Sequence, residues 1–223
     1  MALRFSGVLL GTSVTLLVFG VSLVRPDIAM AQHALPKYEV TGFREARFGM
    51  TEPQVREIAK NSFGVDDGQM TLTTDVVSGT VKLIVHAQAL EPGLGEGRIE
   101  YLFGFTEHKL FQVNVVWGLD TNPPLNNTGM IAGAVRLQRY FAGFAWAIRS
   151  VRTAVPIDER SILLFSGNDG KNGAVFLVAD EVRYEIVTNG IVKLVPEVSS
   201  ATRLTISYES SEADVRDITR RKF

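Results

Sequence analysis

The sequence predicts an α+β fold, in which helices pack on one face of one or more antiparallel sheets. Two amphipathic stretches, at residues 51–64 and 129–149, have the apolar spacing of helices. After each of them come short runs in which apolar and polar residues alternate, separated by turns that contain glycine, asparagine or proline. Each helix is therefore followed by several strands, and this order predicts two αβββ repeats.

A short internal match supports the repeats. Gly49-Met50 and Val55-Arg56 recur eighty positions later as Gly129-Met130 and Val135-Arg136. A unit of one helix and a few strands cannot bury its apolar face alone, so two such units would share a core. We expect residues 43–122 to form the first αβββ unit and residues 123–223 to form the second α+β unit.

The first 31 residues have the layout of a secretory signal peptide. Arg4 is the only charge before an apolar run from Val8 to Val24, and the small residues that end at Ala31 match a cleavage site. We expect residues 1–31 to be removed after Ala31 and the mature protein to be periplasmic or secreted. The alternative is a leader that stays in place as an anchor, and then it would be the protein's contact with the membrane.

Composition excludes several classes of protein. Without Arg4, Arg25 and Asp27, the 23 basic and 24 acidic residues become 21 and 23, and the resulting net charge of about −2 does not favour nucleic acid. The chain has no cysteine, which excludes disulfides, thiol nucleophiles and a lipidated N-terminal cysteine. Removing 31 of the 223 residues leaves 192, which must depend on a buried core for stability.

Residues 32–42 are expected to form a linker and the start of a first strand, and the first helix follows them. Thr51 is a favourable N-cap, and Gln54 can complete a capping box. Pro53 falls in the first turn, where proline is tolerated, and Gly64 can adopt the left-handed conformation that ends a helix. The apolar face of this helix is formed by Val55, Ile58, Ala59 and Ser62.

Four strands are expected after this helix, at residues 70–77, 80–86, 98–105 and 111–117. Aromatic residues line one side of the last two strands: Tyr101, Phe103 and Phe105 on one, Phe111 and Trp117 on the other. Either the helices cover this aromatic surface, or it is an exposed face that recognises a partner.

Pro123 and Pro124 separate the two units, and residues 126–128 can cap the second helix. Apolar residues form a seam along this helix: Met130, Ala134, Leu137, Phe141, Phe144 and Ile148. Trp146 lies closer to Arg139 than to the seam. It is therefore either a contact with a partner or half of a cation–π pair.

The second run of strands begins with a predicted hairpin, in which residues 161–165 and 174–179 flank a turn at 168–173. Further strands are expected at residues 182–186, 191–194 and 204–208. Residues 211–214 resemble a capping box that opens a terminal helical turn, and the basic residues 220–222 are expected to form a frayed tail.

The sequence contains no local motif for catalysis or metal binding. His33, His86 and His108 lack a second ligand at helical spacing, and there is no G-x-S-x-G sequence. The glycine-rich residues 93–97 do not open a helix, so they do not match a phosphate-binding loop. The loop from Asn168 has Ala179 where a calcium loop needs glutamate. We expect no catalytic residue, no metal and no cofactor.

One stretch resembles a known family. The residues that carry it are Phe43, Phe48, Gly49, Met50, Thr51, Gln54, Val55, Ile58 and Ala59, and Tyr101–Thr106 is similar to a strand of the same family. They resemble the tandem-repeat β-lactamase-inhibitory proteins and the outer-membrane assembly lipoproteins of the SmpA/OmlA type. The resemblance implies an α-β-β-β unit whose sheet grips another protein. The inhibitors have disulfides and the lipoproteins have a lipidated cysteine, whereas this chain has no cysteine.

We therefore predict an exported, non-enzymatic protein that binds a protein partner, in envelope assembly or in inhibition. The predicted contacts are Tyr101, Phe103, Phe105, Phe111, Trp117 and Trp146. The alternative is a periplasmic carrier of a small molecule or lipid, with Leu137, Phe141 and Phe144 lining its pocket. A third hypothesis, an exported hydrolase, requires serine, histidine and aspartate to converge in one pocket.

Overall fold

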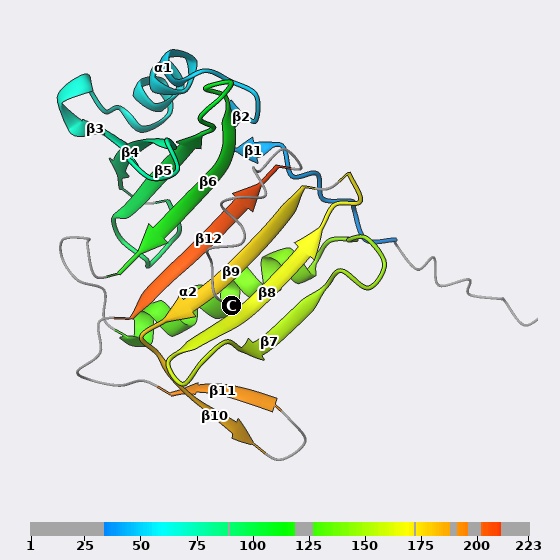
Figure 1. The fold of residues 1–223 in the computed structure, drawn as a ribbon. Coiled ribbons are helices and arrows are strands. Elements are labelled where there is room, and N and C mark those ends of the chain that lie inside the picture. The colour runs from blue at the N-terminus through cyan, green and yellow to red at the C-terminus, as the bar shows by residue number, and fades with distance from the viewer. Residues whose placement is uncertain are drawn as a thin grey trace, which may run out of the picture. The chain divides into compact units, whose positions relative to one another are not determined.

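An antiparallel sheet of eight strands organises this protein (Figure 1). The structure is a computed structural model that describes residues 34–88, 90–118, 127–171, 173–187, 191–195 and 202–210. The strand order is β3-β4-β5-β6-β12-β9-β8-β7, and each strand is antiparallel to its neighbours. Two α-helices accompany the sheet in the described part of the chain, so the predicted α+β class is confirmed.

The strands fall into two runs along the chain. The first run is β3 (Met70–Thr74), β4 (Val81–Ala87), β5 (Gly97–Phe103) and β6 (Leu110–Trp117). The second run is β7 (Arg152–Pro156), β8 (Ser161–Asn168), β9 (Ala174–Asp180) and β12 (Arg203–Glu209). Strands β10 (Arg183–Val187) and β11 (Ile191–Val195) form a separate hairpin between β9 and β12. The final strands of the two runs, β6 and β12, pair at the centre of the sheet.

Side chains that alternate along the strands form the face of the sheet that is turned toward the core. Leu83 and Val85 of β4 lie opposite Tyr101 and Ile99 of β5, and all four side chains are buried. Period-two spacing places these side chains on one face, and Ile84 and Glu100, which lie between them, on the other. The same hydrophobic cluster contains side chains from both helices.

Helix α1 (Glu52–Phe63) confirms the first predicted helix almost residue for residue. The backbone N–H of Thr51 donates a hydrogen bond to Oε1 of Gln54 at 2.9 Å, and Gly64 ends the helix with φ of 65°. Val55 and Ala59 are buried, and the helix contacts β2 and β4. Local sequence alone is enough to specify this element, because the cap, the stop and the apolar face all lie within it.

Helix α2 (Asn127–Ala142) lies across β8 and β9 and is shorter than predicted (Figure 1). The N–H of Gly143 donates to the carbonyl oxygens of Arg139 and Tyr140, and the chain then turns away from the helix axis. Ile148, which the sequence places on the buried seam, is 93% exposed. The prediction of a helix that continues to residue 149 is therefore wrong.

Several predicted element ends also differ from the structure. The strand predicted to reach Val77 ends at Thr74, because Oδ1 of Asp75 accepts the N–H groups of Val77 and Ser78 and forms a turn. Phe105 lies in the turn after β5, outside the strand. The sequence did not predict β7 or the 3₁₀ helix η1 (Asp67–Gln69). Where a first strand was expected before α1, the chain forms the short paired strands β1 (Gly42–Phe43) and β2 (Ala46–Arg47).

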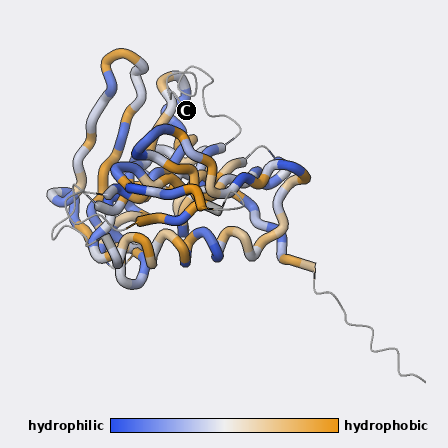
Figure 2. The backbone as a smooth tube through the Cα atoms, turned by 90° about the horizontal axis from the view of Figure 1, so that it is seen from below, coloured by the Kyte–Doolittle hydropathy of each residue, from blue (hydrophilic) through white to orange (hydrophobic). Residues whose placement is uncertain are grey.

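The described residues from Ala34 to Ser210 belong to one compact unit. Figure 2 shows hydrophobic and hydrophilic positions interspersed along the described chain, and none of its helices is long and apolar enough to cross a membrane. Several predictions lie outside the described residues: the signal peptide at 1–31, the break at Pro123 and Pro124, the capping box at 211–214 and the basic tail.

Candidate functional site

Most of the aromatic residues predicted to touch a partner are buried. Tyr101 and Phe103 are 1% exposed, and Trp117 is 2% exposed, because the three side chains belong to the core cluster. Phe111 is also buried. These four side chains do not form a surface that a partner can reach in this structure. Phe105 differs from them, since it is 65% exposed.

Trp146 closes one end of the core. Its ring stacks on Tyr38 with 4.9 Å between centroids, and its Nε1 donates to the backbone oxygen of Phe141 at 2.8 Å. The ring lies against the backbone of Gly167, where a Cβ atom would come within 2.5 Å of it. Tyr38 belongs to the stretch predicted as linker and first strand, more than a hundred residues from Trp146, so no local pattern predicts this contact.

The three residues predicted to line a carrier pocket have different positions. Phe141 is fully buried and stacks on Phe165 with 5.6 Å between centroids. Phe144 packs edge-on against Tyr38. Leu137 alone among the three lines a described cavity, which lies between α2 and the sheet.

An exposed apolar surface forms where two turns meet. The ring of Phe105, in the β5–β6 turn, covers Gly79 in the β3–β4 turn, where a Cβ atom would come within 2.2 Å of the ring. Val76 and Val77, in the same β3–β4 turn, are 94% and 71% exposed. We call Val76, Val77 and Phe105 the apolar tip. Large apolar side chains grouped at the surface are a common mark of protein contact sites.

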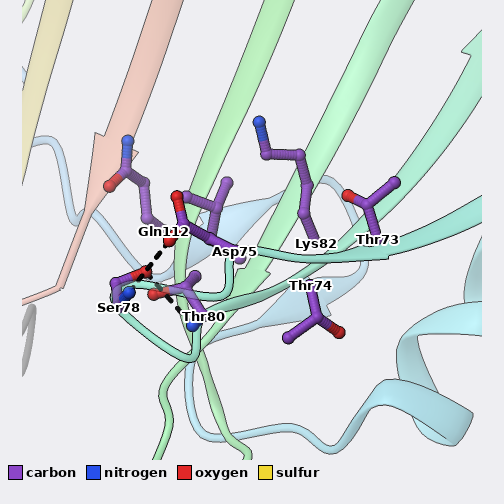
Figure 3. Close-up of a pocket in the computed structure, with 8 residues that line it drawn as sticks. Thr73, Thr74, Asp75, Ser78, Thr80, Lys82 and Gln112 are labelled. Atoms are coloured by element: carbon purple, nitrogen blue, oxygen red, sulfur yellow. Dashed lines mark hydrogen bonds between the residues drawn. The ribbon is translucent and has the colours of Figure 1, made fainter.

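A polar pocket of about 360 Å³ opens beside the apolar tip (Figure 3). Its lining residues come from β3, β4, β5, β6 and the β3–β4 turn: Thr73, Thr74, Asp75, Ser78, Thr80, Lys82, Leu102 and Gln112. The turn is held by its own hydrogen bonds, since Ser78 N–H donates to Asp75 and Thr80 N–H donates to Oγ of Ser78 at 3.2 Å. The pocket therefore offers hydroxyl, amide and ammonium groups from a fixed frame.

A polar network extends from this pocket across the sheet, on the face opposite the hydrophobic core. Gln112 donates to Asn114 at 2.7 Å, and Asn114 donates to Glu100 at 3.3 Å. Glu100 is 7% exposed, and its carboxylate lies 3.4 Å from Nζ of Lys82 and 3.0 Å from Nη2 of Arg98. A buried carboxylate needs such partners.

The two edges of the sheet differ in how they are protected. β7 carries Arg152 and Pro156, and Ala154 has φ of 55° and is skipped in the pairing with β8. Charge, proline and irregular backbone are devices that stop an edge strand from pairing with another chain. β3 has none of them: its sequence is MTLTT, residues 71–74 are exposed, and among the described strands it pairs with β4 alone.

Comparison of the chain with protein-family models, curated proteins and solved structures finds no match. The resemblance to the inhibitory proteins and assembly lipoproteins therefore stays a prediction. Function has to be argued from the site itself.

The described residues do not suggest a metal centre. Among them, no group of three or more histidine, aspartate or glutamate side chains is close enough to hold an ion. His86 pairs with Glu96 through Nδ1 and Oε1, 3.0 Å apart, and Gln88 donates to the other oxygen of the same carboxylate. These contacts form a small hydrogen-bonded group around one carboxylate.

Sequence reasoning missed the pocket and the edge. Lys82, Glu100 and Gln112 stand at the polar positions of alternating strands, so their common face follows from the alternation. Their contact also requires the order β4-β5-β6, which fits strands that follow one another along the chain. The absence of charge and proline from residues 70–74 is likewise visible in the sequence, but it becomes a signal only once β3 is known to be an edge.

Proposed function

We propose that this protein is an exported, non-enzymatic protein that binds a partner protein by pairing β3 with an extended segment of the partner. The observation that carries the proposal is the unprotected edge of β3, next to the apolar tip and the polar pocket. An exposed strand edge offers a row of free N–H and C=O groups, which an added strand can satisfy.

The pocket and the tip give the partner segment its chemistry. Thr73 and Thr74 belong both to the edge strand and to the pocket, so a side chain of the added strand can enter the pocket. Lys82 favours an acidic or amide side chain there. The apolar tip favours an apolar residue farther along the segment. Backbone pairing would supply affinity, and these two contacts would supply specificity.

The strand order suggests how such a protein is built. In each half of the chain, a helix precedes four strands of the main sheet that run from an outer edge to the centre, β3 to β6 in one half and β7 to β12 in the other. We propose that the halves are two copies of an αββββ unit, one strand longer than the predicted repeat, whose helices cover the same face. On this view only the first copy keeps its edge open, because β7 is protected.

A matched pair of variants tests the proposal. Thr73→Lys places a charge on the edge strand β3, whereas Thr153→Lys places the same charge on the protected edge β7, and both threonines are exposed. The wild-type chain and Thr153→Lys should cross-link to the same envelope protein in intact cells, and Thr73→Lys should lose that product. Equal cross-linking by all three proteins, or equal loss in both variants, would count against strand pairing at β3.

A further inference from the structure

A cavity of about 360 Å³ lies between α2 and the sheet, at a different place from the edge of β3. Its lining residues are Phe43, Leu90, Glu91, Trp117, Arg136, Leu137, Tyr140, Ile206 and Tyr208. Apart from Glu91 and Arg136, all of them are aromatic or aliphatic. A cavity of this size and composition is within the usual range for sites that bind small molecules.

Aromatic rings form much of the cavity wall. Trp117 and Tyr208 come from β6 and β12, the two strands at the centre of the sheet, and both side chains are buried. Phe43 packs against Tyr208 with 5.5 Å between ring centroids. Tyr140 of α2 is 53% exposed, so this ring marks the solvent side of the cavity. Such walls favour a ligand that itself contains a ring.

The indole N–H of Trp117 donates to no group among the described residues, although it is buried. Gly97 lies beside it: a Cβ atom on Gly97 would come within 2.9 Å of Nε1 of Trp117 and 2.7 Å of Cδ1 of Leu90. Leu90 therefore packs in the region of the unsatisfied donor. Buried donors in proteins are nearly always paired, so an unpaired one beside a cavity points to an acceptor on a ligand.

The two charges of the lining neutralise each other. Nε of Arg136 lies 3.2 Å from Oε1 of Glu91, and Nη2 of Arg136 donates to the backbone oxygen of Pro92. These contacts tie the segment after Leu90 to helix α2. Because the guanidinium already has a carboxylate partner, the cavity has no free charge to attract an ionic ligand.

We infer that this cavity binds a small uncharged molecule that contains a ring and a hydrogen-bond acceptor. The ring lies between the aromatic wall and Leu137, and the acceptor takes the indole N–H of Trp117. Leu90 moves aside to let the acceptor reach Nε1. The site does not depend on strand pairing at β3, and it assigns a second, independent binding activity to the same chain.

Two probes of similar size separate a specific site from general hydrophobic binding. Coumarin is an uncharged bicyclic molecule with a carbonyl acceptor, and naphthalene is a bicyclic molecule without one. We expect coumarin to bind roughly fivefold to tenfold more tightly than naphthalene, which is the effect of one hydrogen bond. In ¹⁵N spectra of the whole protein, coumarin should move the indole N–H signal of Trp117 and leave that of Trp146 in place. Equal affinity for the two probes, or an unmoved Trp117 signal, would overturn the inference.

Variants locate the site. Leu137→Phe fills the cavity and should weaken coumarin binding by about tenfold. Ile131→Phe adds the same ring to the same helix, but in a groove that α2 shares with β11, and it should bind coumarin as the wild type does. Leu90→Ala opens the way to Nε1 and should strengthen binding, which keeps the test informative if Leu137→Phe does not fold. Unchanged affinity in the cavity variants that fold would also overturn the inference.

Discussion

Two tyrosines of the core, Tyr101 and Tyr208, and Tyr38, which packs against it, make the protein sensitive to alkaline pH. Burial raises the pKa of Tyr38 to about 12 and also raises the pKa values of Tyr101 and Tyr208 above the ordinary value. In the unfolded chain these phenols ionise near pH 10, whereas in the folded protein they keep their protons. Their contribution to stability is therefore complete below about pH 10 and is lost as the pH rises towards the folded-state pKa values.

The prediction is a steep fall in the free energy of unfolding above about pH 10. Tyr101→Phe removes one of the ionising groups, so its stability should fall less steeply over that range than the wild-type stability does. Tyr184→Phe removes the hydroxyl of a half-buried tyrosine of β10 and is the control for the loss of one tyrosine hydroxyl. Denaturant unfolding at a series of alkaline pH values measures the three slopes. A Tyr101→Phe slope equal to that of the wild type would contradict this explanation.

At the scale of elements, α1 ends at a glycine that adopts a left-handed backbone conformation. Gly64 has φ of 65°, and a Cβ atom built there meets no other atom within 4 Å. A side chain at position 64 would therefore not clash with neighbouring groups. The cost of replacing Gly64 comes only from holding another residue in the left-handed backbone conformation. Gly64→Ala should lower the free energy of unfolding by about 1 kcal/mol. Gly64→Asn should lower it by less, since asparagine tolerates this conformation better.

Denaturant unfolding of the two variants measures both changes. Asn61→Ala, at an exposed position of the same helix, is the control and should stay within about 0.5 kcal/mol of the wild type. An alanine variant as stable as the asparagine variant would show that the αL backbone does not set the end of this helix.

The two helices show what the sequence could and could not predict. The ends of α1 depend on Thr51, Gln54 and Gly64, which are close together in the chain, so they were predicted correctly. The end of α2 depends on Trp146 packing against Tyr38 and Gly167, which are distant in the chain. The apolar spacing continues to Ile148, and spacing alone gave no reason to stop at Gly143. Tertiary contact decided the boundary.

At the scale of the whole molecule, the sequence predicted most strands but not their order. Pairing of β6 with β12 places Val115 opposite Ile206, although most of the second half of the sequence lies between these two residues. No local pattern encodes that pairing. The prediction of the partner-binding face failed for the same reason. Alternation correctly grouped Tyr101 and Phe103 on one side of the sheet, but whether that side faces the core or solvent depends on where the helices pack.

Pairing of β6 with β12 also predicts how the molecule unfolds. The sheet is continuous across its centre, and one hydrophobic cluster contains Val55 of α1 and Phe141 of α2, so neither half can lose its packing without exposing the other. We expect a single cooperative transition. The two tryptophans make this measurable, because Trp117 lies on β6 in the first half and Trp146 follows α2 in the second half.

Trp146→Phe leaves Trp117 as the fluorescent reporter of the first half, and Trp117→Phe leaves Trp146 as the reporter of the second half. Each variant has its own stability, so the comparison is made within a variant, between its fluorescence and its far-ultraviolet circular dichroism. Both probes should give the same midpoint and slope in each variant, since losing either half of the shared core exposes the rest. Fluorescence that changes before circular dichroism in one variant would mean that this half unfolds separately, and the central β6–β12 pair would then not couple the halves.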